Sequence, residues 1–221
     1  MRRSEAIQVV LELADGQAGH LTRAQALAWG LDDLTLARLS ADGIVERADH
    51  GVYRLPTASE DDVARIWVAW LRLDPARPAW ERARDPDVVV SHRSAARVYG
   101  LGVLPVELCE FTSTGRARYQ TRRPDVSLRR ARLGSAEWEI VGGLPVTRPH
   151  RILADLVVAG EDGDHLGRIA VEALERHLVT RTELMEALDS VTYNHAPAAN
   201  AGEELLASLL SMAGAESATG R

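Results

Sequence analysis

Lysine is absent from this chain, and all 26 basic side chains are arginine. The absence excludes a phosphate-binding-loop lysine, a Schiff-base lysine and the lysine that kinases and many nucleases use. The single cysteine, Cys109, excludes an internal disulfide, and its apolar neighbours between Val106 and Phe111 predict a buried strand thiol. Most of the machinery of the common enzyme classes is therefore missing, and we expect no enzyme.

Long apolar runs are missing as well. No stretch approaches the roughly 20 apolar residues that a membrane-spanning helix needs, and the first residues carry no signal-peptide hydrophobic core. The chain has 221 residues, 46% hydrophobic side chains and a net charge of −6. This composition predicts a folded cytoplasmic protein with room for two ordinary domains.

Metal-ligand spacing is not seen either. The seven histidines are scattered relative to each other and to the cysteine, so we expect no metal and no cofactor. Ser91, His92 and Ser94 lie close along the chain, but neighbouring side chains are expected to point in different directions, which argues against a nucleophile and its base. Glu137 and Glu139 alternate on a predicted strand without a third acid, which favours a solvated face.

The chain begins with a three-helix pattern. Apolar residues recur at helical spacing over Ile7–Ala14, which predicts a first helix. Thr22 is a good cap for a second helix, and Gly30 has the conformational freedom that the tight turn after it requires. Asp32 is a good cap for a third helix.

A hairpin pattern follows the third helix. That helix turns Leu36 and Leu39 inward, and two short strand-like runs, Ile44–Arg47 and Gly51–Leu55, come after it. Three helices and a hairpin in this order predict a winged helix-turn-helix, a fold used mainly to hold a helix against a DNA groove.

The outward face of the third helix is the predicted DNA-reading surface. Successive helical residues are rotated by about 100°, which places Leu34 and Arg38 opposite the buried leucines. Arg38 can bond a guanine edge and Leu34 can touch a thymine methyl, whereas Asp33 repels phosphate. The candidate DNA-contacting residues of the whole segment are Arg23, Leu34, Arg38, Arg47 and Arg54. Six arginines there face eight acidic side chains, so a winged helix that only docks proteins remains an alternative.

The rest of the chain predicts an α+β domain. A polar break at residues 56–59 marks a boundary near residue 57. A brief strand is predicted over 88–90. From residue 105 to 147 the pattern predicts a small antiparallel sheet, with strand-like runs over 106–113, 125–133, 138–141 and 144–147. Helical patterns span 60–73, 91–99, 151–158, 164–178, 180–188 and 202–212. We therefore expect a winged helix over 1–57, a second domain over 58–212 and a disordered tail over 213–221.

Arginines gather between residues 112 and 132, where Asp125 is the one acid. They are Arg116, Arg118, Arg122, Arg123, Arg129, Arg130 and Arg132. Such a band is suited to extending a DNA footprint or to holding an acidic partner surface. An exposed hairpin whose arginine stems cover the sheet is the alternative.

Two ordered sets of residues resemble a known family. The first set is Leu21-Thr22-Arg23-Ala24-Gln25-Ala26, Gly30, Leu39, Asp42-Gly43 and Gly51-Val52-Tyr53-Arg54. The second set is Ser91-His92-Arg93-Ser94-Ala95-Ala96, Tyr99-Gly100-Leu101, Gly143-Leu144-Pro145-Val146-Thr147, Pro149, Arg151 and Asp155-Leu156. Together they resemble the AbiEi family of antitoxins over about residues 5 to 190.

The resemblance implies a bacterial two-gene module. Antitoxins of this family are encoded beside a nucleotidyltransferase-like toxin, repress their shared promoter through the winged helix and neutralise the toxin through the second domain, in some modules as a defence against phage. The implied partners are thus operator DNA upstream of the gene and a cognate toxin. The second-domain residues that match the family are expected to be structural, and they are His92, Arg93, Arg148, Arg151 and Asp155. Arg151 and Asp155 are expected to form a surface pair at i, i+4 spacing.

Two other functions remain open from the residues. The first alternative is a ligand-responsive transcription regulator whose second domain binds a small molecule. A nucleic-acid-processing enzyme is the other, with the arginine band holding substrate and Glu137 and Glu139 binding a metal ion. The sequence does not assign a role to the Ser91–Ala96 segment.

Overall fold

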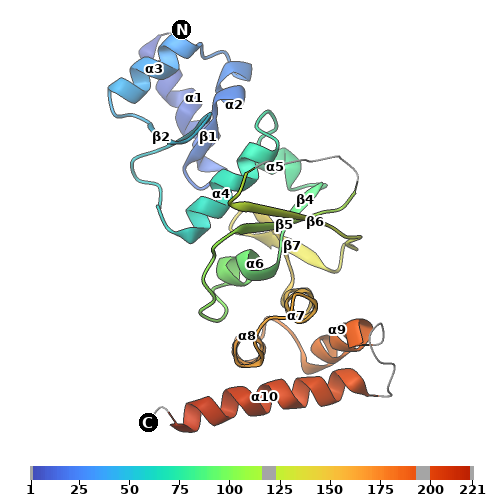
Figure 1. Ribbon diagram of the computed structural model, residues 1–221. Helices are drawn as coiled ribbons and strands as arrows, with labels where there is room; N and C mark the ends of the chain where they lie inside the picture. Colours follow the sequence, from blue (N-terminus) through green and yellow to red (C-terminus); the bar gives the residue numbers. More distant parts are fainter. Residues whose placement is uncertain (1, 116–122, 193–199, 220–221) are drawn as a thin grey trace.

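Figure 1 shows a computed structural model of the chain, which describes residues 2–115, 123–192 and 200–219. The N-terminal elements form one end of the molecule, a twisted sheet occupies the middle and the C-terminal helices form the other end (Figure 1). The α+β class predicted from the sequence is confirmed.

The N-terminal end is a winged helix. Its elements are α1 (Arg3–Asp15), β1 (His20–Thr22), α2 (Arg23–Ala28), α3 (Asp33–Ala41), β2 (Glu46–Asp49) and β3 (Val52–Arg54). The strands pair antiparallel in the order β1-β3-β2. Strand β1 was not predicted, because three residues are too few to show a period of two.

The caps expected from the sequence are confirmed. Thr22 Oγ1 accepts a hydrogen bond from the backbone N–H of Gln25 at 3.1 Å, and Asp32 Oδ1 accepts one from Thr35 at 2.7 Å. Gly30 adopts a φ of 89° at the turn between α2 and α3, a conformation that side chains disfavour. These local choices fix where α2 and α3 begin and therefore which face of α3 points outward.

Helix α4 (Asp62–Leu73) and the short α5 (Ala79–Arg82) connect the winged helix to the sheet. The apolar stripe of α4 is buried as its periodicity predicts, with Trp67 and Trp70 packed edge to face at 5.8 Å between ring centroids. The Trp70 indole N–H donates to the carbonyl of Val88 at 3.0 Å, which ties α4 to the first strand of the sheet.

The second sheet has five strands in the order β6-β5-β4-β8-β7. They are β4 (Val88–Val90), β5 (Cys109–Ser113), β6 (Val126–Arg130), β7 (Trp138–Val141) and β8 (Leu144–Thr147). The β4–β5 and β7–β8 pairs are antiparallel, but β4–β8 and β5–β6 are parallel, so the sheet is mixed and not the antiparallel one expected. The alternation of apolar and polar residues along one strand holds no information about the direction of the neighbouring strand. The parallel pairs could therefore not be predicted from the sequence.

Five helices complete the second domain. They are α6 (His92–Tyr99), α7 (Pro149–Val158), α8 (Gly163–Glu175), α9 (Arg181–Thr192) and α10 (Ala201–Thr219). Figure 1 shows α10 running beneath α8 and α9, and it packs against both. Because α10 continues to Thr219, residues 213–219 of the expected disordered tail are helical.

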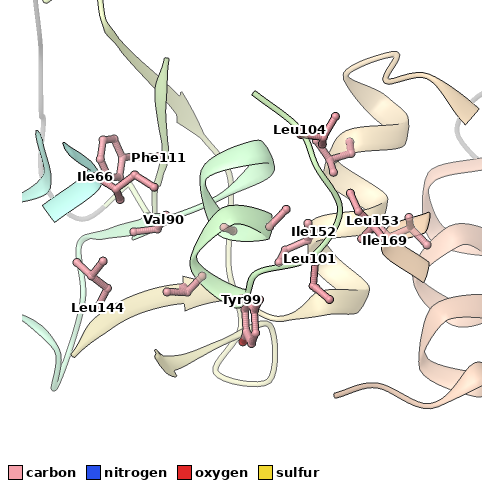
Figure 2. Close-up of a cluster of buried hydrophobic side chains, with 14 of the residues drawn as sticks. Ile66, Val90, Tyr99, Leu101, Leu104, Phe111, Leu144, Ile152, Leu153 and Ile169 are labelled. Carbon is pink, nitrogen blue, oxygen red and sulfur yellow. The ribbon is translucent and has the colours of Figure 1, made fainter. Parts of the chain in front are cut away.

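Buried side chains form two separate clusters. One cluster lies inside the winged helix, and the larger one extends from α4 through the sheet to α10. Figure 2 shows part of the larger cluster, where Phe111 and Val90 of the sheet lie on one side of α6, and Ile152 and Ile169 lie on the other. This continuous core holds α6, α7 and the sheet in fixed relation.

The winged helix is docked onto α5 and the loop before it. Trp29 of the winged helix meets Trp80 edge to face at 6.1 Å, and the ring of Trp80 lies so close to Gly16 that a Cβ there would be 2.8 Å from it. Thr22 Oγ1 donates a hydrogen bond to the carbonyl of Pro75. The winged helix is therefore anchored to the second domain through apolar and polar contacts.

Candidate nucleic-acid interface

The outward face of α3 presents Leu34 and Arg38 to solvent, as predicted. Leu34 is 60% exposed, while Leu36 and Leu39 on the opposite face are buried. Arg38 is exposed and makes no ion pair within 4 Å in the part of the chain that the structure describes. Its guanidinium is thus free to meet a base edge or a phosphate.

Arg23 and Asp33 form a two-pronged ion pair across the helix-turn-helix. Arg23 Nε donates to Asp33 Oδ1 at 2.6 Å, and Nη2 donates to Oδ2. Hydrogen bonds from Arg23 lower the pKa of the Asp33 carboxyl, so this acid stays ionised. The pair offsets the charge of Asp33 beside the groove, and it occupies the guanidinium that we expected to meet DNA.

Arg54 lies on the inner side of the hairpin. Its guanidinium pairs with Glu46 at 2.6 Å and with Glu60, and only 16% of its side chain is exposed. Arg47 is exposed, with Nη2 at 3.2 Å from His50 Nδ1. Of the two hairpin arginines proposed for DNA, Arg47 is thus the accessible one.

Asp49 holds the hairpin against the second domain. Its Oδ2 accepts hydrogen bonds from Arg72 Nη1 at 2.8 Å and Arg123 Nη1 at 2.6 Å, and its Oδ1 accepts one from the His50 backbone at 2.6 Å. Partial burial acts to raise the pKa of Asp49, but these hydrogen bonds and the charge of Arg123 outweigh it and lower the pKa to about 2. The wing is therefore fixed by charged hydrogen bonds that the sequence did not reveal.

The arginine band is divided in the structure. Arg116, Arg118 and Arg122 lie outside the described residues. Arg123 is part of the clamp on Asp49, whereas the three remaining arginines are exposed on or just after β6, namely Arg129, Arg130 and Arg132. Figure 1 places β6 in the middle of the molecule and α3 at the end formed by the winged helix. The exposed arginines of β6 are thus set apart from the face of α3.

Second-domain residues singled out in the sequence meet at one pocket. His92, Arg148, Arg151 and Asp155 all line it. Arg151 and Asp155 form the expected pair, at 2.7 Å, but it is largely buried and not on the surface. His92, expected to point away from its neighbour, instead has Nδ1 at 2.9 Å from Ser91 Oγ, because a φ of 54° turns its side chain back. Arg93 lies apart, with Nε at 2.6 Å from Glu161 Oε2.

Glu137 and Glu139 are held by separate partners. Glu137 Oε1 accepts from Arg151 at 2.6 Å, and Glu139 Oε1 accepts from the Tyr99 hydroxyl at 2.6 Å. Neither carboxylate lies on a simple solvated face. No cluster of three or more metal-ligating side chains occurs among the described residues. Within the same residues, no helix is long and apolar enough to cross a membrane.

The geometry of the N-terminal segment agrees with a comparison against known families. Residues 8–56 match the model of a family described as transcriptional regulator, AbiEi antitoxin. The resemblance to this family predicted from the sequence is confirmed for this segment. The match covers α2, α3 and the hairpin of the winged helix, together with most of α1, while the second-domain residues that resemble the family lie beyond it.

Comparisons over the whole chain address the fold. The crystal structure of the RV2827C protein from Mycobacterium tuberculosis matches with a TM-score of 0.53 and 18% sequence identity. The match covers 93% of this chain and 81% of that one. At this identity the likeness shows the fold alone: the winged helix and the second domain share their arrangement with that protein. No curated protein sequence matches the chain.

Proposed function

We propose that the chain is an antitoxin that represses its own operon by inserting α3 into operator DNA. The exposed pair of Leu34 and Arg38 on α3 carries this proposal. The family match of residues 8–56 supports it, since that family consists of transcriptional regulators. Arg47 on the wing is the second contact, and Arg23 joins it when the pair with Asp33 opens.

The second part of the proposal concerns the toxin. We infer that a nucleotidyltransferase-like toxin, encoded next to this gene in the cytoplasm of a bacterium, is neutralised through the second domain. Catalysis by the chain itself is not part of the proposal. The exposed Arg129, Arg130 and Arg132 supply the cationic surface for an acidic face of the partner.

Repression is tested with a reporter placed behind the DNA upstream of the gene. We expect the wild-type chain to lower expression and Arg38→Ala to restore most of it. Arg181→Ala, which removes an exposed arginine at the start of α9, is the matched control and keeps repression. Full repression by Arg38→Ala would contradict the role of α3.

Neutralisation is tested by co-expression with the neighbouring gene. Growth restored by the full chain and also by Arg38→Ala would separate toxin neutralisation from DNA binding. Equal toxicity with and without the chain would reject the antitoxin role while leaving repression intact.

A ligand-responsive regulator is the second candidate function. The second-domain pocket lined by His92 and Asp155 favours it. A small molecule that changes the affinity for operator DNA would distinguish this function from that of an antitoxin.

A further inference from the structure

A pocket of about 680 Å³ in the second domain gathers polar side chains that DNA binding does not use. Strand β6 contributes Arg129 and Arg130, α6 contributes His92, and α7 contributes Arg151 and Asp155. The volume lies within the range of sites that hold small molecules. The pocket is therefore a candidate ligand site in its own right.

Asp155 supplies a buried oxygen without a partner. Nine-tenths of its side chain is buried, and Oδ1 accepts from Arg151 Nε at 2.7 Å. The other oxygen, Oδ2, is buried and has no hydrogen-bond partner among the described residues. Burial raises the pKa of this carboxyl. An unpartnered polar atom in such a position is disfavoured, so a polar group of a bound molecule would stabilise it.

The arginines of the pocket have unused donors, whereas its acids are mostly engaged. Arg148 Nε is buried without a partner, although its Nη2 lies 3.6 Å from Glu139 Oε2, and Arg129 reaches Glu110 only at 3.5 Å. By contrast, Glu137 accepts from Arg151 at 2.6 Å, and Glu183 accepts from the backbone and hydroxyl of Thr180 at 2.7 Å. Besides Asp155, Glu186 is the remaining acid, and it is exposed. This balance favours an anionic group.

The start of α7 adds to the preference for an anion. The helix begins at Pro149, and its N-cap residue, Arg148, makes no side-chain capping bond. Arg148 and His150, on either side of Pro149, both line the pocket. The free N–H groups and positive dipole end of a helix attract phosphate.

The His92 side chain is an uncharged imidazole whose Nε2–H is available as a hydrogen-bond donor. The Thr112 hydroxyl donates to Ser91 Oγ at 2.9 Å, which leaves the Ser91 hydroxyl hydrogen for His92 Nδ1 at 2.9 Å. The imidazole proton then resides on Nε2. Burial, with the nearby charges of Arg129 and Arg151, lowers the pKa of His92 to about 4, so the ring is uncharged at neutral pH.

We propose that this pocket binds a free mononucleotide. Its phosphate lies against Arg129, Arg148 and the start of α7, and a hydroxyl or amino group of the ribose or base donates to Asp155 Oδ2. Alanine and valine side chains supply apolar surface for the base, and they are Ala131, Ala136, Ala154, Val158, Ala187 and Val191. The inference is independent of DNA binding, since α3 takes no part in it.

Isothermal titration of the full chain with each of the four nucleoside monophosphates tests the proposal. Inorganic phosphate and the matching nucleoside are titrated alongside. We expect at least one nucleotide to bind about tenfold or more tightly than either fragment. Loss of a charged hydrogen bond in Arg129→Gln should weaken its binding by at least about tenfold. Asp155→Asn should weaken it as well, while Arg181→Gln, an exposed arginine outside the pocket, should leave it unchanged.

Several results would overturn the proposal. They are absence of binding by all four nucleotides, equal affinity for inorganic phosphate, tighter binding of a 5′-phosphorylated oligonucleotide than of the nucleotide, and unchanged affinity in Arg129→Gln. Because Asp155 pairs with Arg151, circular dichroism checks that Asp155→Asn is folded. Arg129 is exposed, so its variant decides the matter if Asp155→Asn does not fold.

Discussion

The side-chain amides of Gln17 and Gln25 pair through two hydrogen bonds of 2.9 Å in the interior of the winged helix. Both also reach the second domain: Gln17 Oε1 accepts from the Ala79 N–H at 2.9 Å, and Gln25 Nε2 donates to the Arg77 carbonyl at 3.1 Å. Since both side chains are fully buried, no water replaces these bonds if one amide is lost. The pair therefore stabilises the winged helix and also holds it against the second domain.

Replacing Gln17 with leucine should destabilise the protein. The change leaves the Ala79 N–H and the Gln25 amide without partners in a buried setting, which costs about 2–4 kcal/mol. Urea unfolding, followed by tryptophan fluorescence, measures the free energy of unfolding. Gln8→Leu is the control, because Gln8 is exposed and bonds only to Glu12. Equal stabilities of the two variants would show that the amide pair has no such role.

The clamp on Asp49 predicts a pH dependence. The folded state lowers the pKa of Asp49 from 3.8 to about 2, so the stabilisation is complete above pH 4 and is lost as the pH falls from about 4 towards 2. Asp49→Asn should be less stable than the wild type at pH 7, and the difference should shrink below pH 4. Guanidinium unfolding at a series of pH values measures it. A difference that is the same at pH 7 and pH 3 would argue against the clamp.

Gly167 marks a close approach of α8 and α10. A Cβ at this position would lie 2.3 Å from the carbonyl oxygen of Leu209, so Gly167→Ala forces the helices apart. We expect a loss of about 1–3 kcal/mol in thermal or urea unfolding. Gly214→Ala serves as the opposite case, since nothing lies within 4 Å of its added methyl and alanine favours a helix. A stabilised Gly167→Ala would mean that α10 does not pack as described.

Asp33→Asn should strengthen DNA binding. The change removes a negative charge beside the groove and releases Arg23 from its ion pair, so that one more arginine reaches a phosphate. The slope of log affinity against log salt concentration should steepen by about one. Fluorescence anisotropy at several salt concentrations measures the slope. An unchanged slope would place Arg23 away from the DNA backbone.

The sequence predicts where helices and strands begin and end better than it predicts which of them lie side by side. Thr22, Asp32 and Gly30 act locally, so their caps and turn could be recognised without a structure. The parallel β5–β6 pairing depends on contacts between segments that are far apart in the chain. Periodicity along one segment holds no information about such contacts.

The candidate site divides in the same way: its local part could be predicted from the sequence, whereas the part that depends on distant contacts could not. The outward face of α3 follows from the positions of Leu36 and Leu39, and Arg38 was found in that way. Arg54 looked equivalent, but two acids pair with it, namely Glu46 across the hairpin and Glu60 just after it. Which charged neighbours meet depends on how the hairpin folds, and the sequence does not show this. The pocket around His92 and Asp155 joins five elements, α6, β5, β6, α7 and α9, and the sequence gives no sign of it beyond the family resemblance.

The most direct test of the central claim is fluorescence anisotropy of the full chain with DNA from upstream of its gene. A scrambled duplex and the Arg38→Ala variant are measured in the same salt series. We expect preferential binding to the upstream DNA that weakens with salt, and a loss of about 1–3 kcal/mol of that preference in Arg38→Ala. Equal binding of both duplexes, or an unchanged preference in the variant, would contradict the assignment of α3 as the DNA-reading helix.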